Sequence, residues 1–356
     1  MVDSFHVIGS KRSGGAERFF IRLVEALKVT GHEAVAVIRR GSIISQSLDN
    51  RIRQIHLRMY NNYDLFSALK LRRRIKKDHP DIVQTYMGRA THLTHLSPDK
   101  DVVHIARLGG FYTIRGCYQH AHAWVGNTKA ICDYMVREGL PADRIFFIGN
   151  FVDMPEHTPN EQLTALRRSL KIPADAIIIF SLARFIRKKG IDQLLMAFSR
   201  LPFEVDQRPL SLVIAGDGPD RESLKRLEIT LGLRGRVFWV GWQNKPEIYF
   251  ELADVFVCSS RHEPLGNVIL EAWAHKLPVV ATPTDGAKEL IMKGYNGILS
   301  DENSPKELSN QLLELLQSGQ KQWNKIGMNG MQTLINTHSK KNIVNKYLEL
   351  YDKLQK

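Results

Sequence analysis

Short apolar segments rich in β-branched residues alternate with amphipathic segments along the whole chain, and this alternation limits the possible folds more than any other feature. Strands that alternate with helices indicate a parallel sheet with helices on both faces. A polar, proline-containing stretch at 152–175 interrupts the alternation, which then starts again. Because 356 residues also suit about two ordinary domains, the sequence predicts an α/β protein with two Rossmann-like, doubly wound domains that face each other across a cleft.

The interruption sets the expected domain boundaries. We expect a first domain at 1–155, a second domain at 156–335 and an amphipathic C-terminal helix at 336–356 that could pack back on the first domain. The expected strands are FHVIG, EAVAVI, DIVQTY, VVHIARL, AWVGN, RIFFIG, IIIFSLAR, LSLVIAGDG, VFWVGW, VFVCSS and PVVATP. Ligands in such sheets bind beyond the carboxyl ends of the strands, so the loops that follow these segments are the expected place for a site.

The net charge of +13 is concentrated in the first half of the chain. Residues 1–150 hold 23 Lys and Arg against 13 Asp and Glu, a balance of +10, which leaves +3 for the rest. Such asymmetry indicates an anionic partner: a membrane face, a phosphorylated saccharide or a nucleic acid. The basic residues lack interleaved stacking aromatics, and no zinc or helix-turn-helix pattern is present, so we expect no nucleic-acid partner.

The sequence also bears on the compartment. No apolar run approaches the roughly 20 residues that span a bilayer, and the first residues lack the layout of a signal peptide. Three scattered cysteines, Cys117, Cys132 and Cys258, have no metal-ligand spacing and cannot all pair, which fits a reducing compartment. We therefore expect a cytoplasmic protein.

The segment RHEPLGNVILEAW places two glutamates, Glu263 and Glu271, in a stretch that otherwise has the pattern of a buried turn and helix. A buried carboxylate needs partners, and its two oxygens suit the vicinal hydroxyls of a sugar. Gly266 would let a phosphate approach the free backbone N–H groups of a helix that begins near Asn267. The competing interpretation is that both glutamates are solvated near a helix start, where acidic residues are favoured.

Two other strand-to-helix junctions carry candidate anion sites. Arg184 and Lys189 follow a strand that ends at Ala183, where a guanidinium fork and an ammonium could neutralise a diphosphate. The alternative is a solvated basic loop. Gly14 and Gly15 open the first helix and could admit a phosphate or a sugar to the backbone, although neither a Walker P-loop nor G-x-G-x-x-G is present. The G-x-G of IAGDGP is expected to make a tight turn.

GGAE, ARFIRKKG, IAGDGP, VGW and EPLGNVILEAWAHKLPVVAT, in this order along nearly the whole chain, resemble the retaining glycosyltransferases of family 4, also called group 1. ARLGGFY and GNFVD resemble members that build lipopolysaccharide or other cell-surface saccharides. The resemblance implies a GT-B fold with an acceptor-binding first domain and a nucleotide-sugar-binding second domain. It also implies transfer of a hexosyl group from a nucleotide-diphosphate sugar to a saccharide or lipid-linked acceptor, with retention of configuration.

The resemblance also assigns roles to residues of the second domain. Glu263 would hold hydroxyls of the transferred sugar and Glu271 the ribose diol, while Arg184 and Lys189 would grip the diphosphate. Trp242 and Gln243 would lie near the base. The implied catalytic residues are Arg184, Lys189 and Glu263, and the implied donor-binding residues are Gly14, Gly15, Trp242, Gln243, Leu265, Gly266, Asn267 and Glu271.

Candidates for the acceptor in the first half are Arg107, Asn127 and His104. Many relatives have a histidine after the strand that corresponds to VVHIARL, but here the chain continues with ARLGGFY, and His104 falls inside the strand. A core histidine is therefore the competing interpretation, and the one that we favour, for His104.

We expect neither a metal nor a cofactor. The single D-x-D triplet, Asp99-Lys100-Asp101, lies in a loop before a strand and is expected to be a solvated turn. Within enzymes, the alternative function is a nucleotide-sugar synthase or phosphorylase of the same fold. Outside enzymes, it is a basic nucleic-acid-binding protein.

Residues 64–80 read as one basic helix that starts at a capping Asp64 and ends at the His79-Pro80 break. Leu65, Leu69 and Ile75 are expected near one side. The remainder carries Lys70, Arg72, Arg73, Arg74, Lys76 and Lys77. Such a helix could dock on anionic lipid at the inner face of the membrane and bring the site to a lipid-linked acceptor. The alternative is a solvated helix that keeps the protein soluble or attracts a phosphorylated acceptor.

Overall fold

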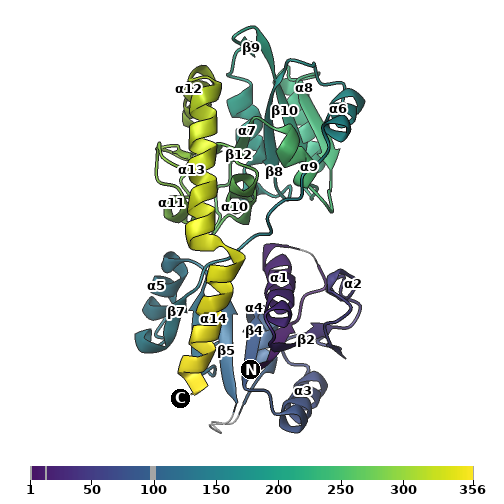
Figure 1. Cartoon of the computed structure of the whole chain (residues 1–356), viewed down its shortest axis with the longest axis vertical. Helices are drawn as coiled ribbons and strands as arrows, with labels where there is room; N and C mark the ends of the chain where they lie inside the picture. Colours follow the sequence, from purple (N-terminus) through teal and green to yellow (C-terminus); the bar gives the residue numbers. More distant parts are fainter. Residues whose placement is uncertain (1, 13, 97–101, 356) are drawn as a thin grey trace. The chain divides into compact units, whose positions relative to one another are not determined.

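The computed structural model describes residues 2–12, 14–96 and 102–355, and these form two compact domains (Figure 1). Domain 1 consists of Met1–Val152 and Thr337–Lys356, and domain 2 consists of Asp153–Asn336. The chain therefore returns to domain 1 at its C-terminal end, inside the helix α13 (Gln320–His338).

Domain 1 is built on a parallel sheet with the strand order β3-β2-β1-β4-β5-β6-β7. The strands are β1 (Asp3–Ile8), β2 (Glu33–Arg39), β3 (Gln54–Leu57), β4 (Ile82–Tyr86), β5 (Val103–Leu108), β6 (Ala123–Gly126) and β7 (Ile145–Phe147). The strand order reverses beside β1, which pairs with β2 on one side and β4 on the other. This is the topological switch at which α/β sheets place ligands.

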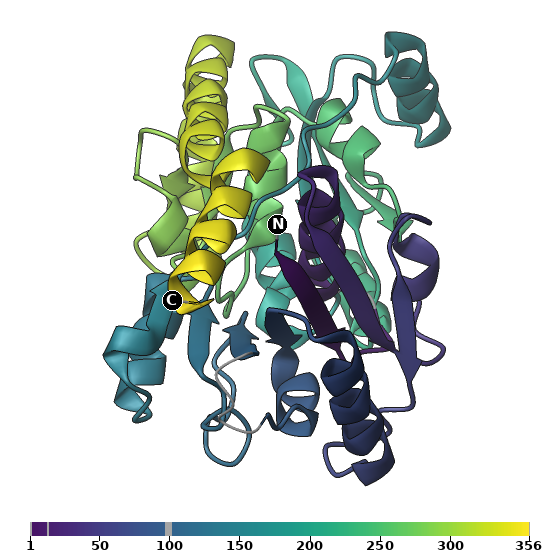
Figure 2. The ribbon, with the colours of Figure 1, turned by 60° about the horizontal axis from the view of Figure 1, so that its bottom comes forward.

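Helices cover both faces of this sheet. They are α1 (Gly15–Val29), α2 (Ile44–Ser47), α3 (Leu65–Asp78), α4 (Met87–Leu93), α5 (Lys129–Arg137), the short η1 (Ala142–Arg144) and α14 (Lys340–Gln355). Successive strand residues point to opposite faces, so Ile8 packs with α1 and α14, whereas Val7 packs with α3 and α4. Figure 2 shows the dark-blue α3 at the periphery of domain 1, as does Figure 1.

Domain 2 repeats the same frame with the parallel order β11-β10-β8-β12-β13-β14. The strands are β8 (Ile177–Leu182), β10 (Arg208–Ala215), β11 (Val237–Gly241), β12 (Val255–Cys258), β13 (Val279–Ala281) and β14 (Ile298–Leu299). The two-residue β9 (Glu204–Val205) pairs antiparallel with β10. The order again reverses beside the first strand of the domain, since β8 lies between β10 and β12.

The helices of domain 2 enclose a second core. They are α6 (Asn160–Ser169), the short η2 (Arg187–Lys189), α7 (Ile191–Phe198), α8 (Arg221–Thr230), α9 (Glu247–Leu252), α10 (Asn267–Ala274), α11 (Asp285–Leu290), α12 (Pro305–Gln317) and α13. Leu194, Leu195 and Phe198 of α7 pack with Leu308 and Leu312 of α12 in this core.

The predicted α/β class and the two Rossmann-like domains are confirmed. Every strand predicted from the sequence is present, and β3, β9 and β14 are additional. The polar stretch at 152–175 contains the helix α6 as well as the passage from domain 1 to domain 2. Across the described residues, no helix has both the length and the apolarity that crossing a membrane requires.

The basic helix predicted at 64–80 is confirmed as α3, but its predicted apolar side is wrong. Asp64 caps the helix by accepting a hydrogen bond from Ser67 N at 3.0 Å, and His79 ends it in the left-handed conformation. Ser67, Leu71 and Ile75 face the core, whereas Leu65 and Leu69 are exposed. Residues at i, i+4 and i+8 lie on one face of a helix, and here they are Ser67, Leu71 and Ile75. The row starts at Ser67 because its hydrogen bonds with the capping Asp64 hold this residue on the buried side.

Candidate active site in domain 2

Two loops meet beyond the carboxyl ends of the neighbouring strands β8 and β12. Arg261 N and His262 N both donate to Lys188 O, at 2.8 and 3.1 Å, so the loop after β12 is hydrogen-bonded to the loop after β8. Gly190 adopts φ +64°, and a Cβ at this position would lie 2.0 Å from Ser259 O. Only glycine fits this close approach, which brings the basic loop against the turn that carries Glu263.

Lys189 and Glu263 form an ion pair between these loops. The Lys189 ammonium contacts Oε2 of Glu263, and Ser260 Oγ donates to the same oxygen at 3.4 Å. The exposed fractions of the two side chains are 27% and 13%, so the pair is partly shielded from water yet accessible. Burial, reinforced by the charge of Glu263, raises the pKa of the Cys258 thiol to about 11, so this cysteine stays protonated and is no nucleophile.

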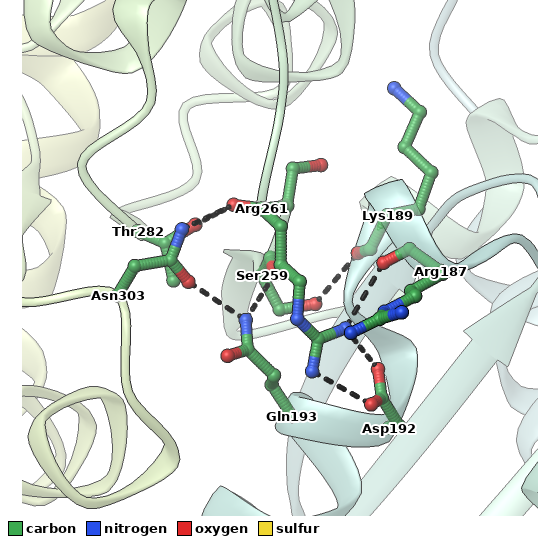
Figure 3. A network of polar contacts seen from close by, with 9 residues as sticks. Arg187, Lys189, Asp192, Gln193, Ser259, Arg261, Thr282 and Asn303 are labelled. Atoms are coloured by element: carbon green, nitrogen blue, oxygen red, sulfur yellow. Dashed lines mark hydrogen bonds and ion pairs between the residues drawn. The ribbon is translucent and has the colours of Figure 1, made fainter.

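A second, bidentate ion pair holds the basic loop in place (Figure 3). Arg261 Nη1 and Nη2 donate to the two carboxylate oxygens of Asp192, at 2.6 and 2.7 Å, and Nη1 also donates to Arg187 O at 3.0 Å. Burial alone would raise the pKa of Asp192, but the hydrogen bonds and charge of Arg261 outweigh it and lower the pKa. In Figure 3 the side chain of Lys189 extends away from this pair, so Arg261 supports the loop and leaves Lys189 for another contact.

Side-chain amides and hydroxyls complete the support of the loop after β12. Gln193 Nε2 donates to Asn303 Oδ1 at 2.8 Å and to Ser259 O at 3.4 Å. Asn303 Nδ2 and Thr282 Oγ1 both donate to Ser260 O (Figure 3). None of these residues, nor Arg261 and Asp192, was predicted. Ser259, Ser260 and Arg261 had a signal in the sequence, because they lie in the same strand-end loop as Glu263.

The turn before α10 has the predicted geometry. Gly266 adopts φ +87° directly before the first helical residue, Asn267, and Leu265 is buried. Gly286 N donates to Glu263 O at 3.0 Å, and a Cβ on Gly286 would lie 2.2 Å from Leu265 O. The first amides of α10 therefore sit in a rigid turn, where the helix dipole favours an anion.

The prediction that the two glutamates are buried needs correction. Both are half-buried, and Glu263 is paired with Lys189 of the other loop. Glu271 lies about one turn inside α10, as predicted. Side chains at the end of a parallel sheet remain partly open to solvent. The two carboxylates are therefore accessible, and the rule that a buried carboxylate needs a ligand as partner does not apply to them.

Arg184 is exposed just beyond β8, next to the buried Phe185. The expected tight turn of IAGDGP is a site of close backbone approach. A Cβ on Gly216 would lie 1.8 Å from Ala183 O, and one on Gly218 would lie 2.4 Å from Phe185 O. These glycines let the loop after β10 pack against the loop that carries Arg184.

Trp242 and Gln243 directly follow β11, which is separated from β8 by β10. Trp242 is half exposed and donates through Nε1 to Asn244 Oδ1 at 3.1 Å. Gln243 Nε2 donates to Val240 O at 2.6 Å. An accessible indole beside strand ends suits a planar base, and this role of Trp242 and Gln243 stays a prediction.

In domain 1, the structure places Arg107 in the interior. Its Nε donates to Tyr347 Oη at 2.9 Å, its Nη2 donates to Asn150 Oδ1, and its guanidinium carbon lies 4.0 Å from the centre of the Phe19 ring. Arg107 is 2% exposed. These contacts hold α14 on the sheet, and the role of Arg107 at an acceptor stays a prediction.

His104 is fully buried, and its Nε2 shares a hydrogen bond with Thr85 Oγ1 at 3.0 Å. Burial lowers the pKa of His104 well below its usual range, as expected for the core histidine that we favoured. Asn127 is buried just after β6, and its Oδ1 has no hydrogen-bond partner among the described residues. Nδ1 of His104 also has no hydrogen-bond partner among the described residues, so both acceptor candidates carry an unused polar atom.

Gly14 and Gly15 mark the start of α1, as predicted. Gly14 is the extended residue before the helix, and a Cβ there would lie 2.9 Å from Oε2 of the buried Glu17. The glycine therefore makes room for a carboxylate in the first turn. A phosphate would have to share this turn with Glu17, and the donor-binding role of both glycines stays a prediction.

Comparison with known proteins shows the family. The model of Glycosyltransferase Family 4 matches residues 13–155, and the model of Glycosyl transferases group 1 matches residues 163–333. The lipopolysaccharide core biosynthesis glycosyltransferase LpsE of Rhizobium meliloti (strain 1021) is 32% identical over 342 residues, which cover 95% of this chain and 96% of LpsE. The chain belongs to the family 4, group 1 glycosyltransferases.

Solved structures show that this glycosyltransferase has the predicted GT-B fold. A glycosyltransferase from Rickettsia africae ESF-5 matches with a TM-score of 0.84 and 23% identity, over 100% of this chain and 99% of that one. Anabaena Alr3699/HepE, solved in complex with UDP and glucose, matches with a TM-score of 0.83 and 19% identity, over 99% of this chain and 100% of that one.

The D-x-D triplet of this glycosyltransferase, Asp99-Lys100-Asp101, lies outside the described residues. Within the described ranges, no group of three or more His, Cys, Asp or Glu side chains is arranged to hold a metal ion.

Proposed function

We propose that this glycosyltransferase moves a hexosyl group from a nucleotide-diphosphate sugar to a saccharide or lipid-linked acceptor, with retention of configuration, in lipopolysaccharide core synthesis. The observation that carries the proposal is the Lys189–Glu263 pair, which lies beside the start of α10 at the switch point of domain 2. The named relatives LpsE and LpsD of Rhizobium meliloti support lipopolysaccharide core synthesis as the setting.

The leaving group of such a transfer is a nucleoside diphosphate, so its negative charge must be stabilised as the sugar acquires oxocarbenium character. Lys189 is held near the turn by its backbone, and Arg184 is exposed on the same loop. Preorganised cations and helix amides of this kind stabilise a developing charge without reorganisation in the transition state. We assign the diphosphate to Arg184, Lys189 and the amides of Leu265, Gly266 and Asn267.

The carboxylates would then orient the rest of the donor. Lys189 and Ser260 both contact Oε2 of Glu263, so Oε1 is the oxygen available to a hydroxyl of the transferred sugar. Glu271, one turn further along α10, would accept the ribose diol, and Trp242 and Gln243 would flank the base. UDP is the first nucleotide to test, because HepE was solved with UDP.

A screen of nucleotide sugars for thermal stabilisation tests the donor. A ligand that binds only the native state, at a free concentration of about 100 times its Kd, raises the free energy of unfolding by about 2.7 kcal/mol. Such an increase gives a readily measured shift in Tm. We expect one UDP sugar or another nucleotide sugar to stabilise the protein more than the matching nucleoside monophosphate. No shift with any nucleotide sugar would contradict the proposal.

Product analysis then separates transfer from the alternative reactions. We expect the purified enzyme to extend a lipopolysaccharide core acceptor and the new bond to keep the anomeric configuration of the donor, as read by NMR. Turnover with inorganic phosphate or a free sugar instead would indicate a phosphorylase or a synthase. We propose that the reaction needs no metal, so activity should persist in EDTA, and a loss that magnesium or manganese reverses would contradict this.

We also propose that the enzyme works in the cytoplasm, where nucleotide sugars are made. Fractionation of cells that produce the tagged full chain should recover it from the cytosol and the inner face of the membrane. Recovery from a secreted or periplasmic fraction would contradict this location.

A further inference from the structure

The helix α3 and the loop before it expose several large apolar side chains close together. Phe66 is 81% exposed and Tyr63 is 82% exposed, and Tyr60, Leu65 and Leu69 are exposed as well. Single exposed apolar residues are normal, but five within ten residues mark an interaction surface. We define the α3 surface as Tyr60, Tyr63, Leu65, Phe66 and Leu69 together with the exposed Lys70, Arg73, Lys76 and Lys77.

These side chains are presented by an ordered segment. The Asp64 carboxylate accepts hydrogen bonds from Ser67 N at 3.0 Å and from Tyr60 N at 3.1 Å. Ser67 Oγ donates to Asp64 at 2.8 Å and accepts from Met59 N at 2.9 Å, and Met59 is fully buried. The buried anchor and the cap therefore fix the loop, so the outward direction of Tyr60 is built into the fold.

The rotation of the helix places the apolar and basic members together. Ser67, Leu71 and Ile75 face the core. At 100° per residue, the side of the helix opposite Leu71 is formed by residues 65, 66, 69, 73, 76 and 77, and residue 70 lies at its flank. In Figures 1 and 2 α3 lies at the periphery of domain 1. The outer face thus combines Phe66 and Leu69 with three cations, and the exposed Lys70 borders it.

The charges of this face are not neutralised within the described part of the chain. Asp78 binds Arg53 at 2.7 Å and Arg74 at 3.0 Å, and Asp64 is engaged in the cap. No hydrogen bond, ion pair or ring contact within the described residues involves the side chains of Lys70, Arg73, Lys76 or Lys77. A partner that is anionic over a broad area would meet all four at once.

We propose that the α3 surface binds an anionic lipid bilayer. Cations attract the headgroups of anionic lipids, aromatic side chains favour the interface, and aliphatic side chains gain from entering the acyl boundary. A nucleic acid could pair with the cations and stack on the tyrosines, but it would give no favourable contact to the exposed Leu65 and Leu69. The proposal is independent of the sugar that the enzyme transfers.

Sedimentation of the full chain with vesicles tests this binding. We expect it to pellet with vesicles that contain phosphatidylglycerol, to stay in solution with pure phosphatidylcholine and to be released by salt. Each charge near the surface strengthens binding by about fivefold. A four-Gln variant, with changes at Lys70, Arg73, Lys76 and Lys77, should therefore bind several hundredfold more weakly. We expect no detectable pelleting of this variant.

Two matched variants make the test specific. The first changes Arg200, Lys306, Lys321 and Lys325, which are exposed in domain 2, to Gln and should bind as the wild type does, because it loses the same charge elsewhere. The second changes Phe66 and Leu69 to Ser at unchanged charge and should weaken binding about tenfold. Both should keep the wild-type Tm and the wild-type response to nucleotide sugars.

Insertion has a separate readout in a Phe66→Trp variant. Its added fluorescence should shift to the blue on anionic vesicles and be quenched by brominated acyl chains, because the indole would lie at the acyl boundary. Equal binding to neutral vesicles, undiminished binding by the four-Gln variant of α3, or no effect of the Phe66 and Leu69 changes would overturn the proposal. Retention of the protein on a nucleic-acid column, with no quenching of the added fluorescence by brominated acyl chains, would also overturn the proposal. It would show that the surface attracts any polyanion by charge alone.

Discussion

The two domains share the order of six parallel strands, to which domain 1 adds β7, but they use the polar residues near their strand ends differently. In domain 1, Arg107 of β5 binds Tyr347 of α14 and Asn150, and all three are buried. In domain 2, Lys189 and Glu263 bind each other between two loops and remain partly exposed. A Rossmann-like sheet can thus use charged residues to close its own core or to leave cations and carboxylates in reach of a ligand.

The largest effect is expected from Arg107→Ala. This change leaves Tyr347 Oη and Asn150 Oδ1 without their buried donor and opens space beside Phe19, which should lower the free energy of unfolding by about 3–5 kcal/mol. Calorimetric unfolding measures this loss, with the exposed Arg115→Ala as the control. If Arg107→Ala keeps the wild-type Tm but loses activity, Arg107 contacts substrate. The difference that we draw between the two domains would then be wrong.

A large loss of activity with little change in stability is expected from Arg184→Ala or Lys189→Ala. Each removes a preorganised cation from the proposed diphosphate site, so the rate of transfer should fall by about 10²-fold or more. The neighbouring, exposed Lys188→Ala is the matched control and should stay close to the wild-type rate. Full activity of both Arg184 and Lys189 variants would reduce the basic loop to a surface feature.

A smaller effect is expected from Glu271→Gln. The substitution keeps the shape of the side chain but removes the charge that strengthens hydrogen bonds to a diol, at a cost of about 1–3 kcal/mol of nucleotide affinity. Isothermal calorimetry with UDP measures it, and Glu314→Gln on the exposed side of α12 is the control. An unchanged Kd would remove Glu271 from the site.

Acid should destabilise the two domains to different extents, because more histidines with a lowered pKa lie in domain 1 than in domain 2. Burial lowers the pKa of His6 to about 3 and lowers the pKa of His104, His120 and His122 in domain 1. In domain 2 it lowers the pKa of His275. The unfolded chain then binds more protons, so the stability is fully present above a pH of about 6.5 and is lost as the pH falls below it.

Domain 1 should therefore lose more stability than domain 2 between about pH 7 and pH 5. Hydrogen exchange at the two pH values measures each domain within the intact chain. Equal losses in both domains, or a domain 1 that becomes more stable in acid, would contradict this expectation.

The frame of the fold could be predicted because its signals are local. Strands such as β8 and β10 are buried on both faces and appear in the sequence as apolar runs. By contrast, β3 has only four residues and exposes His56, so its pattern is weak. The exposed Leu65 and Leu69 misled the prediction for α3, because periodicity does not show which face of a helix meets the core.

The candidate site could be predicted only in part. The residues after β8 and β12 were identified because parallel strands bring their carboxyl ends to one edge. The pairing of Lys189 with Glu263, and of Arg261 with Asp192, joins residues that are far apart in the sequence. Such pairs depend on how the two loops pack. The packing in turn depends on Gly190, which lies against Ser259, and the sequence does not show that these two residues are in contact.

Hydrogen exchange of the full chain with and without saturating UDP tests the central claim most directly. If domain 2 holds the donor, the amides of 184–190 and 263–271 should exchange more slowly with UDP, because they lie in the loops assigned to the diphosphate and ribose. The amides around Arg107 should be unchanged, since that residue is engaged within domain 1. Protection around Arg107 with none at 184–190 and 263–271, under conditions in which calorimetry shows UDP bound, would contradict the account.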